Sequence, residues 1–310
     1  MSHAHATHLS TSVHTDRRWL SAALLLIVAF MAVEVVVGAL IGSLALLSDA
    51  AHMLTDAASL VLALVAMQLA ARPPRGGYTY GLTRAEIASA HVNGITLLVL
   101  AGWLGFVAVQ RLFSPSEVPG APVLVTACVG IAVNLLATWL IGKADRTSLN
   151  VQGAFAHILS DLFAFIATAI AGAVILLTGF VQADAIATLI VVALMVFAGL
   201  RLVRDSGRIF LEAAPSGVDP ARLGAQLVAI PMVIELHDLH VWSISSQQPA
   251  LSAHVVVADG VDCHALRQQI EHWLIDTYGI EHSVLQVDHA AELEDRKHCA
   301  QSHGPTHWAQ

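Results

Sequence analysis

Six long apolar stretches constrain the fold of this 310-residue chain more than any other feature of its sequence. A helix that crosses a bilayer needs about 20 mainly apolar residues, and each stretch is about that long. Only 12% of the residues are charged, which is about half the proportion in ordinary soluble domains. The sequence therefore predicts an α-helical membrane protein with six transmembrane helices between residues 17 and 210. The predicted helices cover residues 19–41, 44–70, 87–113, 122–141, 151–180 and 183–202.

Basic residues between the stretches predict which helix ends face the cytoplasm. Arg17 and Arg18 precede the first stretch, whereas the loops on the opposite side carry only Arg111 near a helix end. By the positive-inside rule, both termini are predicted to be cytoplasmic, which agrees with an even number of helices. The remaining basic residues on the predicted cytoplasmic side are Arg72, Arg75, Arg84, Lys143, Arg146, Arg201, Arg204 and Arg208.

The character of the chain changes after residue 210. The turn-forming sequence EAAPSGVDP is followed by segments with the pattern helix, strand, strand, helix and strand. This order predicts a small α+β domain over residues 211–290, with its sheet covered on one face. Residues 1–16 and 291–310 contain many histidines and few large apolar residues, and we expect them to be disordered tails. Metal capture by these tails and a chance accumulation of histidines both stay open.

The sequences AHMLTD and AHILSD repeat one pattern inside two apolar stretches. Residues four apart lie on one face of a helix, so His52 pairs with Asp56, and His157 pairs with Asp161. Zinc accepts tetrahedral sets of His and Asp ligands, whereas Mg²⁺ and Ca²⁺ prefer oxygen. The alternative is a local salt bridge in each helix. However, an Asp at mid-membrane costs ~2.5–3.5 kcal/mol, and intramembrane ionisable residues usually mark ion pathways. We therefore predict a two-His, two-Asp transport site.

The predicted ligands also bind protons. Imidazole and carboxylate groups must both lose their protons to hold a metal ion, and an unperturbed histidine titrates near ~6.5. Metal and H⁺ therefore compete for the site, which is the chemistry of an antiporter. Asp49 lies three residues before His52, near the same helix face, and we expect it to support the site without being a primary ligand.

Taken together, four segments of the chain resemble the cation diffusion facilitator family. They are SLALLSDAAHMLTDAASL (residues 43–60), YTYGLTRAEIASAHVNG (78–94), GAFAHILSDLFA (153–164) and LHDLHVWSISSQQPALSAHVVV (236–257). The resemblance implies six spanning helices, a homodimer and a cytoplasmic ferredoxin-like domain. It also implies export of Zn²⁺ or a similar divalent metal in exchange for H⁺. His52 and Asp56 match the second-helix half of the family's transport site, and His157 and Asp161 match the fifth-helix half.

The resemblance further implies a second metal site in the cytoplasmic domain. Ordinary strand or surface histidines are an equal alternative, and Gln286 stands where some family members have another His. Tyr78 and Leu82 stand where some members have histidines of an additional interfacial site, so we do not expect that site here. The residues at the family's ligand positions in the cytoplasmic domain are His237, His254, His282, Asp288 and His264.

Other functions stay open on the sequence alone. Co²⁺, Cd²⁺, Ni²⁺ or Fe²⁺ could be the main substrate, because affinity trends do not exclude them. A metal sensor that does not transport is a second alternative. An intramembrane metallohydrolase is less well supported, because the chain lacks H-E-x-x-H and four ligands would close the site.

We therefore predict a secondary transporter and not an enzyme. Its expected partners are divalent metal ions, protons, the lipid bilayer and a second copy of the chain, with no nucleic acid. No cofactor is expected apart from structural or regulatory Zn²⁺ in the cytoplasmic domain. The short loop GKADRTSLN between the fourth and fifth helices lacks the run of histidines that many eukaryotic zinc-transporting members of the family have. In this respect the chain resembles bacterial members, which implies a location in the bacterial inner membrane.

Overall fold

The computed structural model describes residues 4–41, 44–114, 120–144, 148–291 and 304–309. Within its helices, only the backbone is described for residues 4–16, 34, 37–39, 41, 44–52, 55, 120–123, 126 and 184. The chain divides into two compact units between Ser206 and Gly207, and each unit is described by itself.

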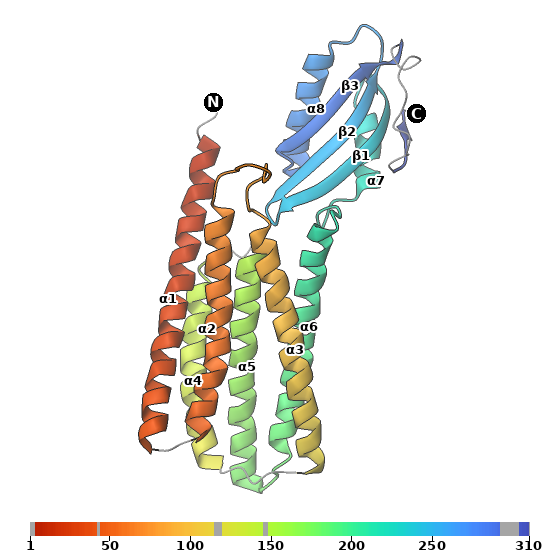
Figure 1. Cartoon of the computed structure of the whole chain (residues 1–310). Coiled ribbons are helices and arrows are strands. Elements are labelled where there is room, and N and C mark those ends of the chain that lie inside the picture. The colour runs from red at the N-terminus through yellow and green to blue at the C-terminus, as the bar shows by residue number, and fades with distance from the viewer. Residues whose placement is uncertain (1–3, 42–43, 115–119, 145–147, 292–303, 310) are drawn as a thin grey trace. The chain divides into compact units, whose positions relative to one another are not determined.

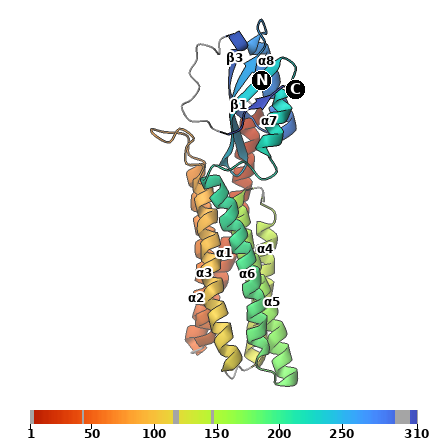
Figure 2. The same ribbon diagram turned by 90° about the vertical axis from the view of Figure 1, so that its right-hand side faces the viewer.

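The first unit consists of long helices that run side by side, with successive helices in opposite directions (Figures 1 and 2). Helix α1 begins well inside the segment that we expected to be a disordered tail. Residues 4–18 contain neither Pro nor Gly, so no residue there interrupts the helix. The helices are α1 (Ala4–Ile41), α2 (Leu44–Ala70), α3 (Ala85–Phe113), α4 (Gly120–Ile141), α5 (Leu149–Thr178) and α6 (Ala183–Phe210).

The helices of the first unit have the apolar surface of a membrane protein. Within the described parts of the chain, three helical segments are long and apolar enough to cross a bilayer: Ala85–Phe113, Leu149–Thr178 and Ala185–Phe210. Their large apolar side chains are widely exposed, which suits a surrounding of lipid. Examples are Trp103, Phe106, Phe113, Ile170, Leu177 and Phe197.

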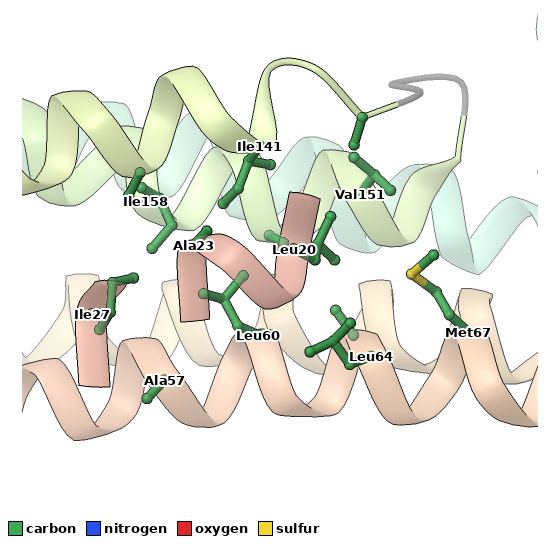
Figure 3. Packing of buried hydrophobic residues seen from close by; sticks show 14 of the residues in the cluster. Leu20, Ala23, Ile27, Ala57, Leu60, Leu64, Met67, Ile141, Val151 and Ile158 are labelled. Carbon is green, nitrogen blue, oxygen red and sulfur yellow. The ribbon is translucent and has the colours of Figure 1, made fainter. Parts of the chain in front are cut away.

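Buried side chains divide the first unit into two packed groups. The larger group joins α1, α2, α4 and α5 around residues such as Leu20, Leu60 and Ile158 (Figure 3). The smaller group joins α3 and α6, and it also contacts α5. Close approach of α3 and α6 depends on glycine, because a Cβ at Gly94 would lie 2.9 Å from Val203 Cγ2. We call the surface where α3 and α6 pack against α5 the seam.

The second unit is an α+β domain with the element order that the sequence predicted. Strands β1 and β2 pair in antiparallel fashion, and β2 and β3 pair in parallel through the crossover helix α8. The sheet order is β3-β2-β1-β4. The elements are α7 (Pro220–Val228), β1 (Val233–Ser245), β2 (Gln248–Val257), α8 (Cys263–Tyr278), β3 (His282–His289) and β4 (His307–Trp308).

Strand β4 corrects the prediction that the C-terminal segment is disordered throughout. It pairs with the edge of β1, with Leu236 opposite His307, and Ala309 N–H donates to the carbonyl oxygen of Ile234 at 2.9 Å. The His307 ring lies against Gly224 of α7, where an added Cβ would lie 2.3 Å from Nε2. The otherwise unpaired edge of β1 and the space above Gly224 therefore hold this short segment.

Candidate metal sites

Three buried ligand side chains meet between α2 and α5. Asp56 of α2 and Asp161 of α5 are each 4% exposed, and His157 of α5 is 1% exposed. His157 Nε2–H donates to Asp56 Oδ1 at 3.1 Å, and the same nitrogen lies 3.9 Å from Asp161 Oδ2. One ligand atom from each residue lies within 4.8 Å of the other two. The two repeated motifs therefore supply one common cluster.

Helix packing fixes the cluster in place. Asn150 Nδ2–H donates to the carbonyl oxygen of Ala63 at 2.9 Å, which joins α5 to α2. Asn150 precedes His157 by seven residues, and Ala63 follows Asp56 by seven, so the bond lies about two turns from the cluster on each helix. Because α2 and α5 run in opposite directions (Figure 1), the Asn150–Ala63 bond and the His157–Asp56 bond form in the same relative register of the two helices.

The fourth predicted ligand, His52, has its backbone in α2, but its side chain lies outside the described residues. The same holds for Asp49, the predicted supporting residue. One helical turn separates His52 from Asp56, so the sequence still predicts that it shares the ligand face. The complete set of two His and two Asp stays a prediction, of which the structure brings three members together.

His157 Nε2 is an atom that either a proton or a metal ion can occupy. An ionised carboxylate can only accept a hydrogen bond, so this nitrogen carries the proton when it bonds to ionised Asp56. A zinc ligand must instead offer its lone pair at ~2.0–2.1 Å from the ion. A metal ion that binds to Nε2 therefore takes the place of the proton on that nitrogen, and the site loses a net proton when the ring starts as an imidazolium, with both nitrogens protonated. The second ring nitrogen, Nδ1, is buried and makes no hydrogen bond to any described residue.

A second ligand cluster lies on the sheet of the other unit. His237 of β1 stands opposite His254 of β2, with ring centroids 5.2 Å apart. His254 Nδ1 lies 3.7 Å from Asp238 Oδ2, and His237 Nδ1 lies 3.0 Å from Glu235 Oε1. One ligand atom from each of His237, Asp238 and His254 lies within 4.8 Å of the others, and all three residues are half-buried.

Asp238 was missed by sequence reasoning because a backbone irregularity brings it to this cluster. Neighbouring residues of a regular strand point to opposite faces. Here the β1–β2 register shifts between His237 and His240, and Asp238 has a φ of 50°. A bulge of this kind re-aims side chains, and Asp tolerates the left-handed conformation better than most residues. No feature of the residue pattern predicts that positive φ.

The remaining residues predicted for the cytoplasmic site lie outside this group. Gln286 is the β3 neighbour of His254, and His282 lies four residues away from Gln286, or about 13 Å along the strand. Asp288 Oδ2 accepts a hydrogen bond from Gln286 Nε2 at 2.7 Å. His264 lies exposed in the first turn of α8. Their assignment as ligands stays a prediction.

A helical membrane unit with buried imidazole and carboxylate ligands, followed by a separate α+β unit, defines a membrane transporter of cations as the class of this protein. Residues 20–211 match the family model for the cation efflux transmembrane domain. Residues 215–290 match that for the cytoplasmic domain of cation efflux proteins. The chain belongs to the cation efflux family, the cation diffusion facilitators, which confirms the resemblance found in the sequence.

Relatives match the chain along nearly its whole length. The zinc transporter ZitB of Escherichia coli (strain K12) is 38% identical over 293 residues, which cover 93% of each protein. The cadmium, cobalt and zinc/H(+)-K(+) antiporter of Bacillus velezensis (strain DSM 23117 / BGSC 10A6 / LMG 26770 / FZB42) is 34% identical over 293 residues, with the same coverage. A solved structure of the metal-bound C-terminal domain of the CzcD transporter from Cuprividus metallidurans has 32% identity and a TM-score of 0.22. It covers 23% of this chain and 99% of that one.

Proposed function

We propose that this protein exports Zn²⁺ from the cytosol in exchange for H⁺. Asp56, His157 and Asp161 hold the ion, and His52 completes a tetrahedral site. The observation that carries the proposal is the position of His157 Nε2, which donates to one carboxylate and lies near a second. The lone pair of Nε2 can bind either a proton or a metal ion, but not both, so the two compete for this nitrogen. The names of the relatives, a zinc transporter and a metal/H(+)-K(+) antiporter, support this function.

The ligand types favour zinc over hard ions. Imidazole nitrogen suits Zn²⁺ and other late transition metals, whereas Mg²⁺ and Ca²⁺ prefer oxygen alone. A relative named for cadmium, cobalt and zinc favours Cd²⁺ and Co²⁺ as further substrates of this chain. Geometry alone does not separate these ions, because the same four ligands accept each of them.

The proposal includes a topology with α1 to α6 as spans and both termini in the cytoplasm. Lys143 Nζ lies 5.0 Å from the ring centroid of Trp19 and 3.8 Å from that of Trp139. Tryptophan is enriched at membrane–water interfaces, and a Lys ammonium is attracted to the face of an indole ring. Basic residues gather at this end of the helices, which supports a cytoplasmic position. The bacterial relatives support a location in a bacterial inner membrane.

We further propose that the second unit is a ferredoxin-like cytoplasmic domain through which two chains form a homodimer. The match to a family model for the cytoplasmic domain supports this assignment. His237, Asp238 and His254 would hold Zn²⁺ that stays with the protein, because two imidazoles and a carboxylate suit this ion. The three residues are half-buried, so zinc from the cytosol can reach them.

Transport by purified protein in proteoliposomes tests the main proposal. Zinc accumulation is measured with and without an imposed pH gradient for wild type, Asp161→Asn and Ser160→Ala. Ser160 is a matched control, because its hydroxyl bonds to Ala156 O within α5. We expect wild type and Ser160→Ala to accumulate zinc along the gradient and Asp161→Asn to lose this activity. Full activity in Asp161→Asn would contradict the site, and zinc binding without any flux in wild type would favour a sensor.

A further inference from the structure

Three polar atoms near the ion site are buried and make no hydrogen bond to any described residue. They are Ser89 Oγ, Asn93 Nδ2 and Asn150 Oδ1. Ser89 and Asn93 are 2% exposed, and Asn150 is 0% exposed. A buried polar atom without a partner destabilises a fold, and the bilayer core offers no water to satisfy it. Three such atoms in one region therefore require an explanation.

These atoms follow one another towards the ion site. Asn150 lies two turns before His157 on the same face of α5. Asn93 lies against Gly153, one turn before His157, since an added Cβ at Gly153 would lie 3.5 Å from Asn93 Nδ2. Ser89 lies one turn before Asn93 on α3. Because α3 and α5 begin at the same end of the first unit (Figures 1 and 2), the polar atoms extend from that end towards the cluster.

The same residues lie at the seam between the two helix groups. A Cβ at Gly153 would also lie 3.2 Å from Leu202 Cδ2 of α6 and 3.6 Å from Ala90 Cα of α3. The packing of α3 and α6 onto α5 therefore depends here on a glycine and leaves polar atoms unsatisfied. Opening of the seam would admit water, which would satisfy these atoms and offset part of the lost packing.

We infer that Ser89, Asn93 and Asn150 line the hydrated path by which a divalent transition-metal cation reaches Asp56 and His157 when the seam opens. This inference rests on the proposed function. The oxygens Ser89 Oγ and Asn150 Oδ1 can replace some of the waters that the ion sheds, whereas Asn93 Nδ2 donates hydrogen bonds to the water of the path. Because these groups are neutral, they bind the ion more weakly than carboxylates do. These atoms are therefore unpaired in the closed seam because the surface to which they belong contacts water in another state of the transport cycle.

Replacement of the amide by an apolar group separates this role from a structural one. In Asn93→Leu, we expect thermal stability to be unchanged or higher, because an unpaired buried amide is removed. Zinc flux should fall at least about tenfold, while zinc affinity of the purified protein stays the same. Asn134→Leu is the control, because buried Asn134 bonds to Gly130 O of its own helix, and it should lose stability and keep its flux. Unchanged flux in Asn93→Leu would overturn the inference.

Water access can be measured without relying on transport. The native cysteines of the full chain, Cys128, Cys263 and Cys299, are first changed to Ser. A single cysteine is then introduced at position 89, 93 or 97. A membrane-impermeant thiol reagent is added from the side where α3 begins. We expect Ser89→Cys and Asn93→Cys to be labelled, and Leu97→Cys, which lies in an apolar cluster, to be protected. Protection of both positions 89 and 93 with and without zinc would refute the path, whatever ion the protein carries.

Discussion

His157 of α5 donates a hydrogen bond to Asp56 of α2 over 3.1 Å, with both side chains buried in the first unit. The two residues are 101 positions apart, and each belongs to one copy of the repeated motif. Their contact joins the two motifs through the imidazole nitrogen at which, in the proposed function, a metal ion and a proton compete. The stability of this part of the helix packing and the chemistry of transport therefore share one interaction.

Asp56→Asn should abolish zinc transport while leaving the helices folded. The amide keeps the shape of the side chain and can still accept the hydrogen bond from His157, but it loses the charge that binds the ion. Loss of a group that hydrogen-bonds to a metal ligand already costs about 10–100-fold in metal affinity, so loss of a ligand's charge should lower zinc affinity by more than about 100-fold. Zinc titration of the purified protein checks this. Ser59→Ala serves as control, because Ser59 Oγ bonds to Asp56 O within α2.

His157→Asp should change which metals the protein carries. The carboxylate of the new Asp supplies an oxygen ligand in place of the imidazole nitrogen. Oxygen ligands favour Mn²⁺, the harder ion, relative to Zn²⁺. We expect the ratio of zinc to manganese flux to fall at least about tenfold. Competition between the two ions in one proteoliposome assay measures this ratio directly. A ratio equal to that of wild type would mean that His157 does not contact the ion during transport.

His254→Ala and Asp238→Ala should each remove about one bound zinc ion per chain. Both residues belong to the cluster on β1 and β2, whereas His282 lies about 13 Å further along the sheet. His282→Ala should therefore keep its zinc. Metal analysis of purified protein after removal of free zinc provides the measurement. Loss of zinc in His282→Ala with retention in Asp238→Ala would favour the ligand set implied by family resemblance.

Gly224→Ala should release the C-terminal strand from the second unit. A methyl group at this position would collide with the His307 ring, while the rest of α7 would gain helix stability. Limited proteolysis should then cut the chain near residues 304–309 faster than in wild type. Gly207→Ala is the control, because a Cβ there meets no atom within 4 Å. Equal cleavage of wild type and Gly224→Ala would show that the glycine is not needed to hold β4.

The sequence predicted the features that depend on local pattern. Helical spacing alone placed Asp161 beside His157, and repetition of the motif linked them to Asp56. Alternation of apolar residues predicted the sheet of the second unit. These features follow from helix and strand periodicity, which can be read from consecutive residues.

Features that depend on contacts between distant segments could not be predicted in this way. Asp238 joins the cytoplasmic cluster through a bulge, and His307 pairs with β1 across more than 60 intervening residues. Asn93 and Asn150 look like ordinary polar residues of a helix until their neighbours are known. In each case the deciding information is the position of another element, and no local pattern contains it.

Proton release on zinc binding tests the central claim most directly. Calorimetric titration of zinc into a His254→Ala variant, in two buffers of different ionisation enthalpy near neutral pH, counts protons released at the membrane site. We expect zinc to release protons, and the release to decrease when His157→Gln is added, because the variant lacks the imidazole whose proton zinc displaces. Zinc binding that releases no proton, or equal release with and without His157, would contradict a site at which H⁺ and metal displace each other.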